Sequence, residues 1–231
     1  MITSTEAELF ELYFWPTPNG YKVSILLEEL EVPYRLIPVN ITAGDQHAPD
    51  FIDRFANEKI PGLIHHHSAE SLPRTIFESG AILLYLADWF GRFLPESVEN
   101  RWRCLQWLFW QVGGLGPMAG QSHHFNQYAT EKIAYAIDRY QRECLKHYQI
   151  LERQLQKTSF LAGDYSIADI AVLGWVFRHE RHRVVLEHFP AVEAWYAGLM
   201  NREAVKRGFE TGADLIPLGN FNTTEAREKL F

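Results

Sequence analysis

A chain of 231 residues can form one large domain or two small ones, and either arrangement can bury a sizeable hydrophobic core. With 47% hydrophobic and 14% aromatic residues, the chain should be globular and not disordered. Its net charge of -7 and isoelectric point near 5.8 argue against a nucleic acid or an anionic membrane as partner, because there is no basic excess to release counterions.

The sequence contains no sign of a signal segment, a redox cysteine pair or a metal site. Residues 1–11 are acidic and lack an apolar core of signal-peptide length, and no run of about 18 apolar residues occurs. We therefore expect a cytoplasmic protein. Cys104 and Cys144 form no close-spaced pair, which supports neither a disulfide scaffold, a redox dithiol nor a cysteine zinc site. The histidines at 65–67 and 123–124 do not supply three convergent ligands, so we expect no bound metal.

In the first half of the chain, apolar runs alternate with turn residues in a βαβαββα order. The expected elements are a strand at 9–14, a turn at 15–20, a helix at 21–31, a strand at 34–39, a short helix at 49–55, strands at 59–64 and 75–79, and a helix at 79–87. Pro38 indicates that the second strand is an edge strand. This order predicts an α/β layer with one parallel unit and one hairpin, which is thioredoxin-like in outline.

The segment from Lys59 to Ser79 has the features of a binding site. Pro61 cannot donate a hydrogen bond to a sheet, so a strand that contains it should be an edge or be broken there, which leaves the main chain of Ile60 free to pair with an extended peptide. Ser79 fits the N-cap of the next helix, whose N-terminus favours an anion, and Glu78 can accept from an ammonium. Together they suit a zwitterionic amino-acid head group. Taken singly, each piece also fits an edge strand followed by an ordinary capped helix.

The second half of the chain predicts helices alone, after a turn-rich connector at 91–97. The expected helices lie at 101–111 and 131–157, with further ones that begin after Ser166 and at Pro190. Ser166 and Asp169 have the spacing of a capping box. The letters from Gly114 to Ala119 match a dinucleotide fingerprint, but they follow a helix and contain a proline, so we interpret them as a helix kink. We expect the tail after Gly208 to be irregular.

Lys59-Ile60-Pro61, followed by Glu78-Ser79 and an apolar helix, resembles the glutathione-binding half of the cytosolic glutathione transferases. In that family the proline is cis, the residue before it pairs with the cysteinyl backbone of glutathione, and Glu-Ser holds the γ-glutamyl end. The resemblance extends over residues 12–195. Its most specific parts lie at 105–118, 123–126 and 139–140.

The resemblance implies the glutathione transferase fold, with a thioredoxin-like α/β N-terminal domain at 1–91 and an all-α C-terminal domain at 98–231. It also implies a homodimer. Residues 17–20, Thr-Pro-Asn-Gly, place no tyrosine, serine or cysteine at the catalytic turn and resemble the bacterial nu class. In that class the threonine and the asparagine contact the glutathione sulfur, and glutathione-dependent disulfide-bond reductase activity is characteristic.

By this resemblance Thr17 and Asn19 are the catalytic residues, and glutathione is a cosubstrate in its reduced or disulfide form. A hydroxyl or amide donor near a helix N-terminus would promote a thiolate from a group with a pKa of about 8.5. The implied glutathione-binding residues are Gln46, Lys59, Ile60, Pro61, Glu78, Ser79 and Arg139. Judged without the family, Asn19 also fits a simple helix cap and Arg139 a solvated helix face.

The implied reaction is reduction of a small disulfide by the thiolate of bound glutathione. Rival activities of the same thiolate are conjugation to an electrophile and reduction of a peroxide. A different class of function is a non-catalytic regulatory module that binds glutathione, because fold does not fix function. Two residues depart from the family pattern: Trp15 stands where a smaller residue is common, and Glu58 lies beside Lys59 and would weaken its pull on a carboxylate.

Overall fold

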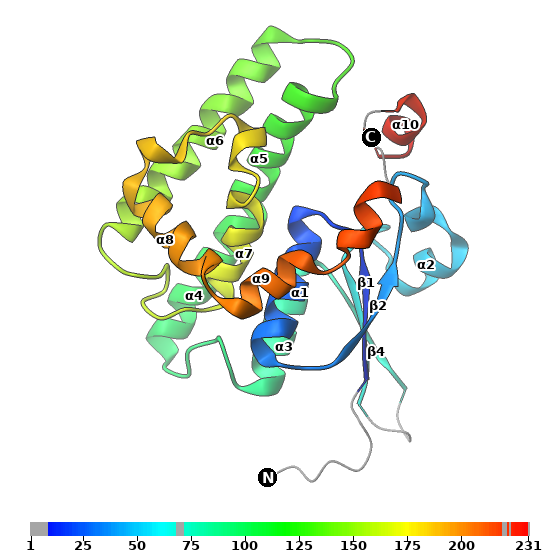
Figure 1. Ribbon diagram of the computed structural model, residues 1–231. Helices are drawn as coiled ribbons and strands as arrows, with labels where there is room; N and C mark the ends of the chain where they lie inside the picture. The colour runs from blue at the N-terminus through cyan, green and yellow to red at the C-terminus, as the bar shows by residue number, and fades with distance from the viewer. Residues whose placement is uncertain (1–8, 68–71, 219–220, 222, 231) are drawn as a thin grey trace. The chain divides into compact units, whose positions relative to one another are not determined.

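The computed structural model describes residues 9–67, 72–218, 221 and 223–230 (Figure 1). The chain packs into two compact units: Met1–Ile82 together with Arg207–Phe231 forms the first, and Leu83–Lys206 forms the second. The expected domain limits, 1–91 and 98–231, stay a prediction. None of the described helices combines the length and the apolarity needed to cross a membrane.

The first unit contains a mixed four-stranded sheet. Its strands are β1 (Leu9–Phe14), β2 (Tyr34–Pro38), β3 (Gly62–His66) and β4 (Arg74–Phe77), in the order β2-β1-β3-β4. β1 pairs with β2 in parallel and with β3 antiparallel, and β3 and β4 form the hairpin. The α/β layer is confirmed, and β2 is the edge strand that Pro38 indicated.

Alternate residues of β1 face two different helices. Phe14 and its neighbours on one face are fully buried, and the Phe14 ring packs edge-on against Tyr21 of α1 (Pro18–Leu30). On the other face, Tyr13 packs against the aromatic rings of α2 (Pro49–Arg54) and the residue after it, Phe55. Figure 1 shows α1 and α2 on opposite sides of the sheet. Because successive side chains of a strand point to opposite faces of the sheet, β1 contributes to an apolar layer on each face, one against α1 and one against α2.

The strand expected at 59–64 is shifted in the structure. β3 begins at Gly62, so Pro61 precedes the strand and does not interrupt it. β3 is also an interior strand, because β1 takes one of its sides and β4 the other. The edge position that Pro61 suggested is therefore wrong, since a proline just before a strand removes no ladder donor. The Ile60–Pro61 peptide bond is cis, as the resemblance implied.

The tail expected to be irregular contains helices. After α9 (Glu203–Glu210) come the 3-10 helix η6 (Ala213–Leu218) and α10 (Thr224–Leu230). The tail is held by tertiary contacts: the Ser24 hydroxyl of α1 donates to the Gly208 carbonyl at 2.8 Å. A Cβ atom at Gly208 would lie 2.6 Å from the Ile25 Cα, so only glycine permits this approach. Such contacts leave no periodic signal in the sequence.

The second unit is helical. Its helices are α4 (Val98–Trp110), α5 (Gly116–His123), α6 (Ala134–Leu155), α7 (Ile167–Val176) and α8 (Pro190–Met200), and α3 (Ser79–Phe90) leads into it from the first unit. The 3-10 helices η4 (His179–His182) and η5 (Leu186–His188) connect α7 to α8. A π-helical segment, Gln111–Leu115, separates α4 from α5 where a kink was expected. Within the described part of this unit, the sole strand-like pairing is an isolated bridge between Ala162 and Asp164.

The capping box at the start of α7 is confirmed. The Ser166 hydroxyl accepts from the Ala168 N–H, and the Asp169 carboxylate accepts from the Ser166 N–H. Asp169 also accepts from the Leu161 N–H and from the Trp195 indole N–H, both at 3.0 Å. Burial raises the pKa of Asp169 to about 6, although these donors oppose the shift. One side chain therefore joins the α7 N-terminus, the preceding loop and α8.

Candidate functional site

The turn after β1 places Thr17 at the N-terminus of α1. Thr17 is the N-cap, and its hydroxyl oxygen accepts from the Gly20 N–H at 3.2 Å. Because the oxygen is the acceptor, the hydroxyl hydrogen remains able to donate elsewhere. A Cβ atom at Gly20 would lie 2.4 Å from the Trp15 carbonyl oxygen, so the turn requires glycine there. The alternative that Asn19 caps α1 is wrong, because Asn19 lies inside the helix, one residue after Pro18.

Other hydroxyl groups near this turn are committed to packing. Tyr13 faces α2 on the opposite side of the sheet, with its ring centroid 5.0 Å from that of Phe55. Ser24 is fully buried, and its hydroxyl lies within hydrogen-bonding distance of two main-chain carbonyls. Thr17 and Asn19 are half-buried at the helix start. These two side chains are therefore the better placed to meet a ligand there.

The segment before β3 has a buried side chain and an available backbone. Ile60 packs its side chain against the apolar cluster of Val39, Phe51, Phe55 and Ile64. Among the described residues, none forms a main-chain hydrogen bond with Ile60. Pro61 is buried, and Lys59 is exposed. An extended peptide could therefore pair with Ile60 while Pro61 holds the segment against the core.

The turn between β4 and α3 carries two of the expected binding groups. Glu78 has a left-handed backbone, with φ of 68°, and its exposed carboxylate accepts from the Asn57 side chain at 3.2 Å. Ser79 is the first residue of α3, so the expectation that it is the N-cap is wrong, and only 7% of it is exposed. An acceptor for a cation therefore lies next to the unsatisfied N–H groups of a helix N-terminus. This arrangement matches the two charges of an amino-acid head group.

One residue of this region was missed in the sequence. Lys22, in the second turn of α1, is 1% exposed, and its ammonium donates to the Ser79 hydroxyl oxygen at 3.3 Å. Burial lowers the pKa of Lys22 to about 7, and the nearby Glu78 carboxylate limits that fall. The sequence signal that could have found it is a lysine in the mostly apolar run of residues 21–27. Its partner, however, is 57 residues away in the sequence.

Gln46 is held by the C-terminal helix. It lies in the 3-10 helix η1 (Asp45–His47) and is 5% exposed. Its side-chain nitrogen donates to the Lys229 carbonyl of α10 at 3.1 Å, and its oxygen has no hydrogen-bond partner among the described residues. This contact, like α10 itself, could not be foreseen from the residues around Gln46.

The two residues that depart from the family pattern have local partners. Glu58 accepts from the His47 ring at 2.9 Å, and this hydrogen bond raises the pKa of His47. The Glu58 carboxylate therefore binds a histidine, although Glu58 is also the neighbour of Lys59 in the sequence. Trp15 is 1% exposed, so its bulk contributes to the core of the first unit.

Arg139 belongs to the second unit, whereas the other expected site residues all belong to the first. It lies on α6 and is exposed. The first unit thus contains the turn that carries Thr17 and Asn19, the Ile60 segment and the Glu78 turn. The part of Arg139 in the site stays a prediction.

Neither cysteine is an activated thiol. Cys104 and Cys144 are both free and buried. Burial raises the pKa of Cys104, and it raises that of Cys144 to about 12. Both thiols therefore stay protonated near neutral pH, and a reactive thiolate at this site would belong to a bound ligand.

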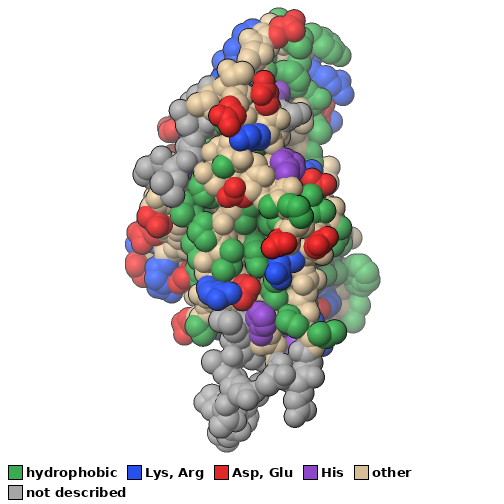
Figure 2. Space-filling model, turned by 90° about the vertical axis from the view of Figure 1, so that its right-hand side faces the viewer, with side chains coloured by type: hydrophobic (Ala, Val, Ile, Leu, Met, Phe, Trp, Pro, Cys, Tyr) green, Lys and Arg blue, Asp and Glu red, His purple; other side chains and the backbone are tan. Residues whose placement is uncertain are grey.

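The charged side chains on one face, and the metal-ligating residue types among the described residues, bear on what a charged partner or a metal would need. On the face in Figure 2, acidic and basic side chains are interspersed with hydrophobic and polar ones. Within the described residues, no group of three or more His, Cys, Asp or Glu side chains has an arrangement that could hold a metal ion.

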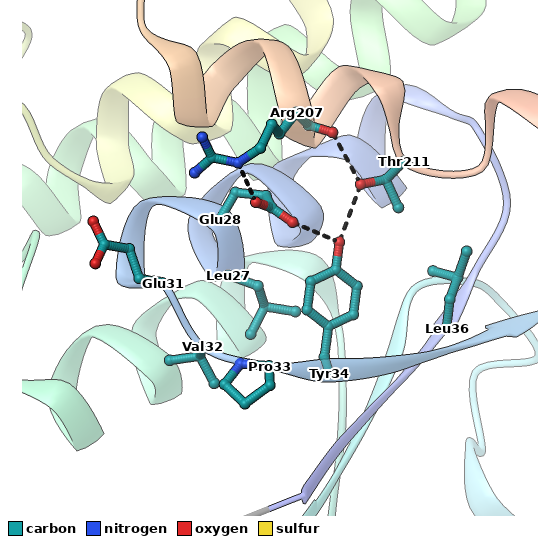
Figure 3. Close-up of a pocket in the computed structure, with 9 residues that line it drawn as sticks. All are labelled: Leu27, Glu28, Glu31, Val32, Pro33, Tyr34, Leu36, Arg207 and Thr211. Carbon is teal, nitrogen blue, oxygen red and sulfur yellow. Dashed lines mark hydrogen bonds and ion pairs between the residues drawn. The ribbon is translucent and has the colours of Figure 1, made fainter.

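A separate pocket lies between α1, β2 and the C-terminal segment (Figure 3). Its polar side chains bind one another: Arg207 donates to Glu28 at 2.7 Å, and the Tyr34 hydroxyl contacts both Glu28 and Thr211. Burial is the main cause that raises the pKa of Tyr34 to about 12. None of the expected glutathione-binding residues lines this pocket. We interpret it as a structural contact between the C-terminal segment and α1.

Comparison with known proteins identifies both halves of the chain. The family model described as "Glutathione S-transferase, N-terminal domain" matches residues 9–88, and that described as "Glutathione S-transferase, C-terminal domain" matches residues 115–203. The chain is 48% identical over 198 residues to the disulfide-bond oxidoreductase YfcG of Escherichia coli strain K12, a match that covers 85% of this chain and 92% of YfcG. It is 38% identical over 217 residues to the disulfide-bond oxidoreductase YghU of the same strain, covering 86% and 73% of the two chains.

A solved structure matches most of this chain. It is a glutathione transferase from Pseudomonas putida with one glutathione disulfide bound per subunit. The two chains are 38% identical, with a TM-score of 0.84, and the match covers 90% of this chain and 94% of the other.

Proposed function

The chain belongs to the glutathione S-transferase family, and we propose that it is a glutathione-dependent thiol-disulfide oxidoreductase of the nu-class type. The observation that carries the proposal is the capping geometry of Thr17, whose hydroxyl accepts from the Gly20 N–H and keeps its own hydrogen for a ligand. The similarity to two relatives named disulfide-bond oxidoreductases supports the same reaction.

The expected binding residues, all but Arg139 in the first unit, would bind glutathione along its length. The γ-glutamyl carboxylate would bind at Ser79 and the N-terminus of α3, and the γ-glutamyl ammonium would bind at Glu78. The cysteinyl backbone would pair with Ile60, which Pro61 holds in place. Lys59 and Gln46 would serve the rest of the tripeptide, and Arg139 would contact a carboxylate of glutathione disulfide. The supporting facts are the burial of Ser79 and the exposure of the Glu78 carboxylate.

Thr17 and Asn19 would stabilise the thiolate of bound glutathione. A thiol of ordinary pKa, about 8.5, is mostly protonated at neutral pH, and donors near a helix N-terminus lower that pKa. The α1 N-terminus supplies both the dipole and the Thr17 hydroxyl. The protein's own thiols are buried, and burial raises the pKa of both, so the reacting sulfur would be the ligand's.

The reaction would proceed by two thiol-disulfide exchanges. The glutathione thiolate attacks one sulfur of a small disulfide, which forms a mixed disulfide and releases the other half as a thiolate that takes up a proton. A second glutathione thiolate attacks the glutathione sulfur of the mixed disulfide and releases the second half. Two glutathione molecules are thereby oxidised to glutathione disulfide, and one disulfide is reduced to two thiols.

We further infer a homodimer and a cytoplasmic location. The outer face of α4 carries two large exposed apolar side chains seven residues apart, Trp102 at 61% and Phe109 at 64% exposure. Residues at this spacing share a helix face, and such a patch suits an interface with a second copy. Two free, buried cysteines are compatible with a reducing compartment.

The test measures glutathione binding and turnover on the same preparation. Calorimetric titration gives the affinity, and steady-state assays follow reduction of hydroxyethyl disulfide, conjugation to a chloronitrobenzene and reduction of cumene hydroperoxide. We expect disulfide reduction to be the fastest of the three. Faster conjugation or peroxide reduction would favour those rival activities. Binding without turnover of any of the three would instead identify a regulatory module.

A further inference from the structure

A buried ammonium lies behind the hydroxyl that begins α3. Lys22 is 1% exposed, and its Nζ lies 3.3 Å from the Ser79 Oγ. Lysine is almost never fully buried without a partner, because removing its charge from water is costly. A lysine on the exposed face of the helix would not have this cost. The burial of Lys22 therefore suggests that its charge has a role beside Ser79.

The contact determines how the Ser79 hydroxyl is oriented. An ammonium has only donors, so the Ser79 oxygen is the acceptor of this hydrogen bond. The hydroxyl hydrogen of Ser79 must then point away from Lys22. It joins the main-chain N–H groups of the α3 N-terminus, which also lack acceptors within the helix. Lys22 therefore sets the direction in which Ser79 can donate.

We propose that Lys22 is a positioning residue of the glutathione site, which orients the Ser79 hydroxyl toward the γ-glutamyl carboxylate and places a buried positive charge behind it. The proposal rests on the proposed function, because it assumes that glutathione binds at Glu78 and Ser79. Lys22 acts through Ser79 and through its charge, and it need not touch the ligand.

The charges around Lys22 agree with this role. Burial lowers its pKa to about 7, and the Glu78 carboxylate is the charged group that opposes the fall. A ligand carboxylate bound at Ser79 would favour the charged form, so ligand binding and the Lys22 charge stabilise each other.

The test is a thermodynamic cycle in which one change removes the Lys22 charge and the other removes a carboxylate charge of the ligand. Calorimetry measures the affinity of wild type and of Lys22→Met for glutathione, for glutathione amidated at its γ-glutamyl α-carboxylate, and for glutathione amidated at its glycyl carboxylate. We expect Lys22→Met to bind glutathione about tenfold more weakly, in line with the loss of one charge-assisted interaction. The affinity of Lys22→Met for the glycyl amide should be reduced by the same factor relative to wild type. Its affinity for the γ-glutamyl amide should be almost the same as that of wild type.

Turnover distinguishes positioning from catalysis. Lys22→Met should raise the KM for glutathione and leave kcat nearly unchanged, because the interaction is present in the ground state and the transition state alike. The matched control is Ser24→Ala, which removes another buried hydrogen bond of α1, to the Gly208 carbonyl. It should lower the melting temperature without changing the affinity for any of the three ligands.

The outcomes separate this inference from the proposed function. If wild type fails to bind glutathione, the proposed function falls. Another outcome is that wild type binds glutathione while Lys22→Met binds it equally well, or while the affinity of Lys22→Met is reduced by the same factor for all three ligands. Either result refutes the role of Lys22 and leaves the proposed function standing. Should Lys22→Met not fold, Lys22→Gln keeps a donor without the charge. The same ligand comparison then applies to it, with a smaller loss expected.

Discussion

At the scale of single residues, the Thr17 hydroxyl caps α1 and is, by the proposed function, also the donor to the ligand's thiolate. Its oxygen caps α1 and its hydrogen is free to donate, whereas Asn19 has no capping role. We expect Asn19→Ala to lower kcat for disulfide reduction by about tenfold to a hundredfold, because a hydrogen bond to a charged group contributes about 1.5–3 kcal/mol. Thr17→Ala should do the same and also lose about 1 kcal/mol of stability with the cap.

The measurement for this pair is disulfide reduction across pH. The pKa of the bound thiol should rise in both alanine variants, so their activity should recover partly at higher pH. Thr17→Ser keeps the hydroxyl and serves as the control for folding. Unchanged turnover and an unchanged pH profile in both alanine variants would place thiolate stabilisation elsewhere.

Glu78 should govern binding and not chemistry. Its exposed carboxylate lies at a turn beside Ser79. By the proposed function it would bind the ligand's ammonium equally in the ground state and the transition state. We expect Glu78→Ala to raise the KM for glutathione with little change in kcat. Glu99→Ala, which removes an exposed carboxylate of the second unit, is the control that should change neither. A fall in kcat alone for Glu78→Ala would contradict this assignment.

The two cysteines should be dispensable for turnover. Cys104 and Cys144 are buried, and burial raises the pKa of both thiols. We expect the double alanine variant to keep its rate of disulfide reduction per folded molecule, with a loss of stability from the small cavities it leaves. Folded protein is quantified by circular dichroism before the assay. A collapse of turnover in folded protein would assign the sulfur chemistry to the protein itself.

At the scale of an element, α7 depends on one carboxylate. Asp169 accepts hydrogen bonds from the Ser166 and Leu161 N–H groups and from the Trp195 indole, all in the core of the second unit. Asp169→Ala would leave these buried donors unpaired, and we expect it to lower the free energy of unfolding by about 2–4 kcal/mol. Urea unfolding measures this, with Asp164→Ala, an exposed carboxylate in the same loop, as the control. Equal stability of the two variants would show that the donors find other acceptors.

At the scale of the whole molecule, one buried and one partly buried histidine should make the fold sensitive to acid. Burial lowers the pKa of His123 to about 4 and that of His182 to about 3. An unfolded histidine binds its proton near pH 6.5, so as pH falls below about 6.5 the unfolded state binds more protons and stability falls. Asp169 acts in the opposite direction between about pH 6 and pH 4, because its pKa is raised in the folded state.

The expected result is a lower free energy of unfolding at pH 5 than at pH 7. Urea unfolding at the two pH values measures the difference for wild type, His182→Gln and His188→Gln. The buried substitution should reduce the pH dependence by about 1–2 kcal/mol, and the exposed control at His188 should leave it unchanged. An equal pH dependence in all three proteins would exclude His182 as a source of acid sensitivity.

The sequence by itself determined the βαβαββα order of the first half of the chain and some of the local signals at the ends of its elements. Alternation and helical periodicity gave the β1-α1-β2 order, and the spacing of Ser166 and Asp169 gave the start of α7, because these patterns depend on neighbours a few residues apart. The resemblance of the Thr17 turn and the Glu78-Ser79 pair to a known family supplied the expected site.

Only the tertiary structure decided which distant residues meet. It placed β3 inside the sheet, assigned the cap of α1 to Thr17, and brought Lys22 to Ser79 across 57 residues and Gln46 to Lys229 across 183. The physical reason is that a side chain's local pattern records which face of its own helix or strand it occupies. Its partner on another element is selected when all the elements pack together, and no local period carries that choice.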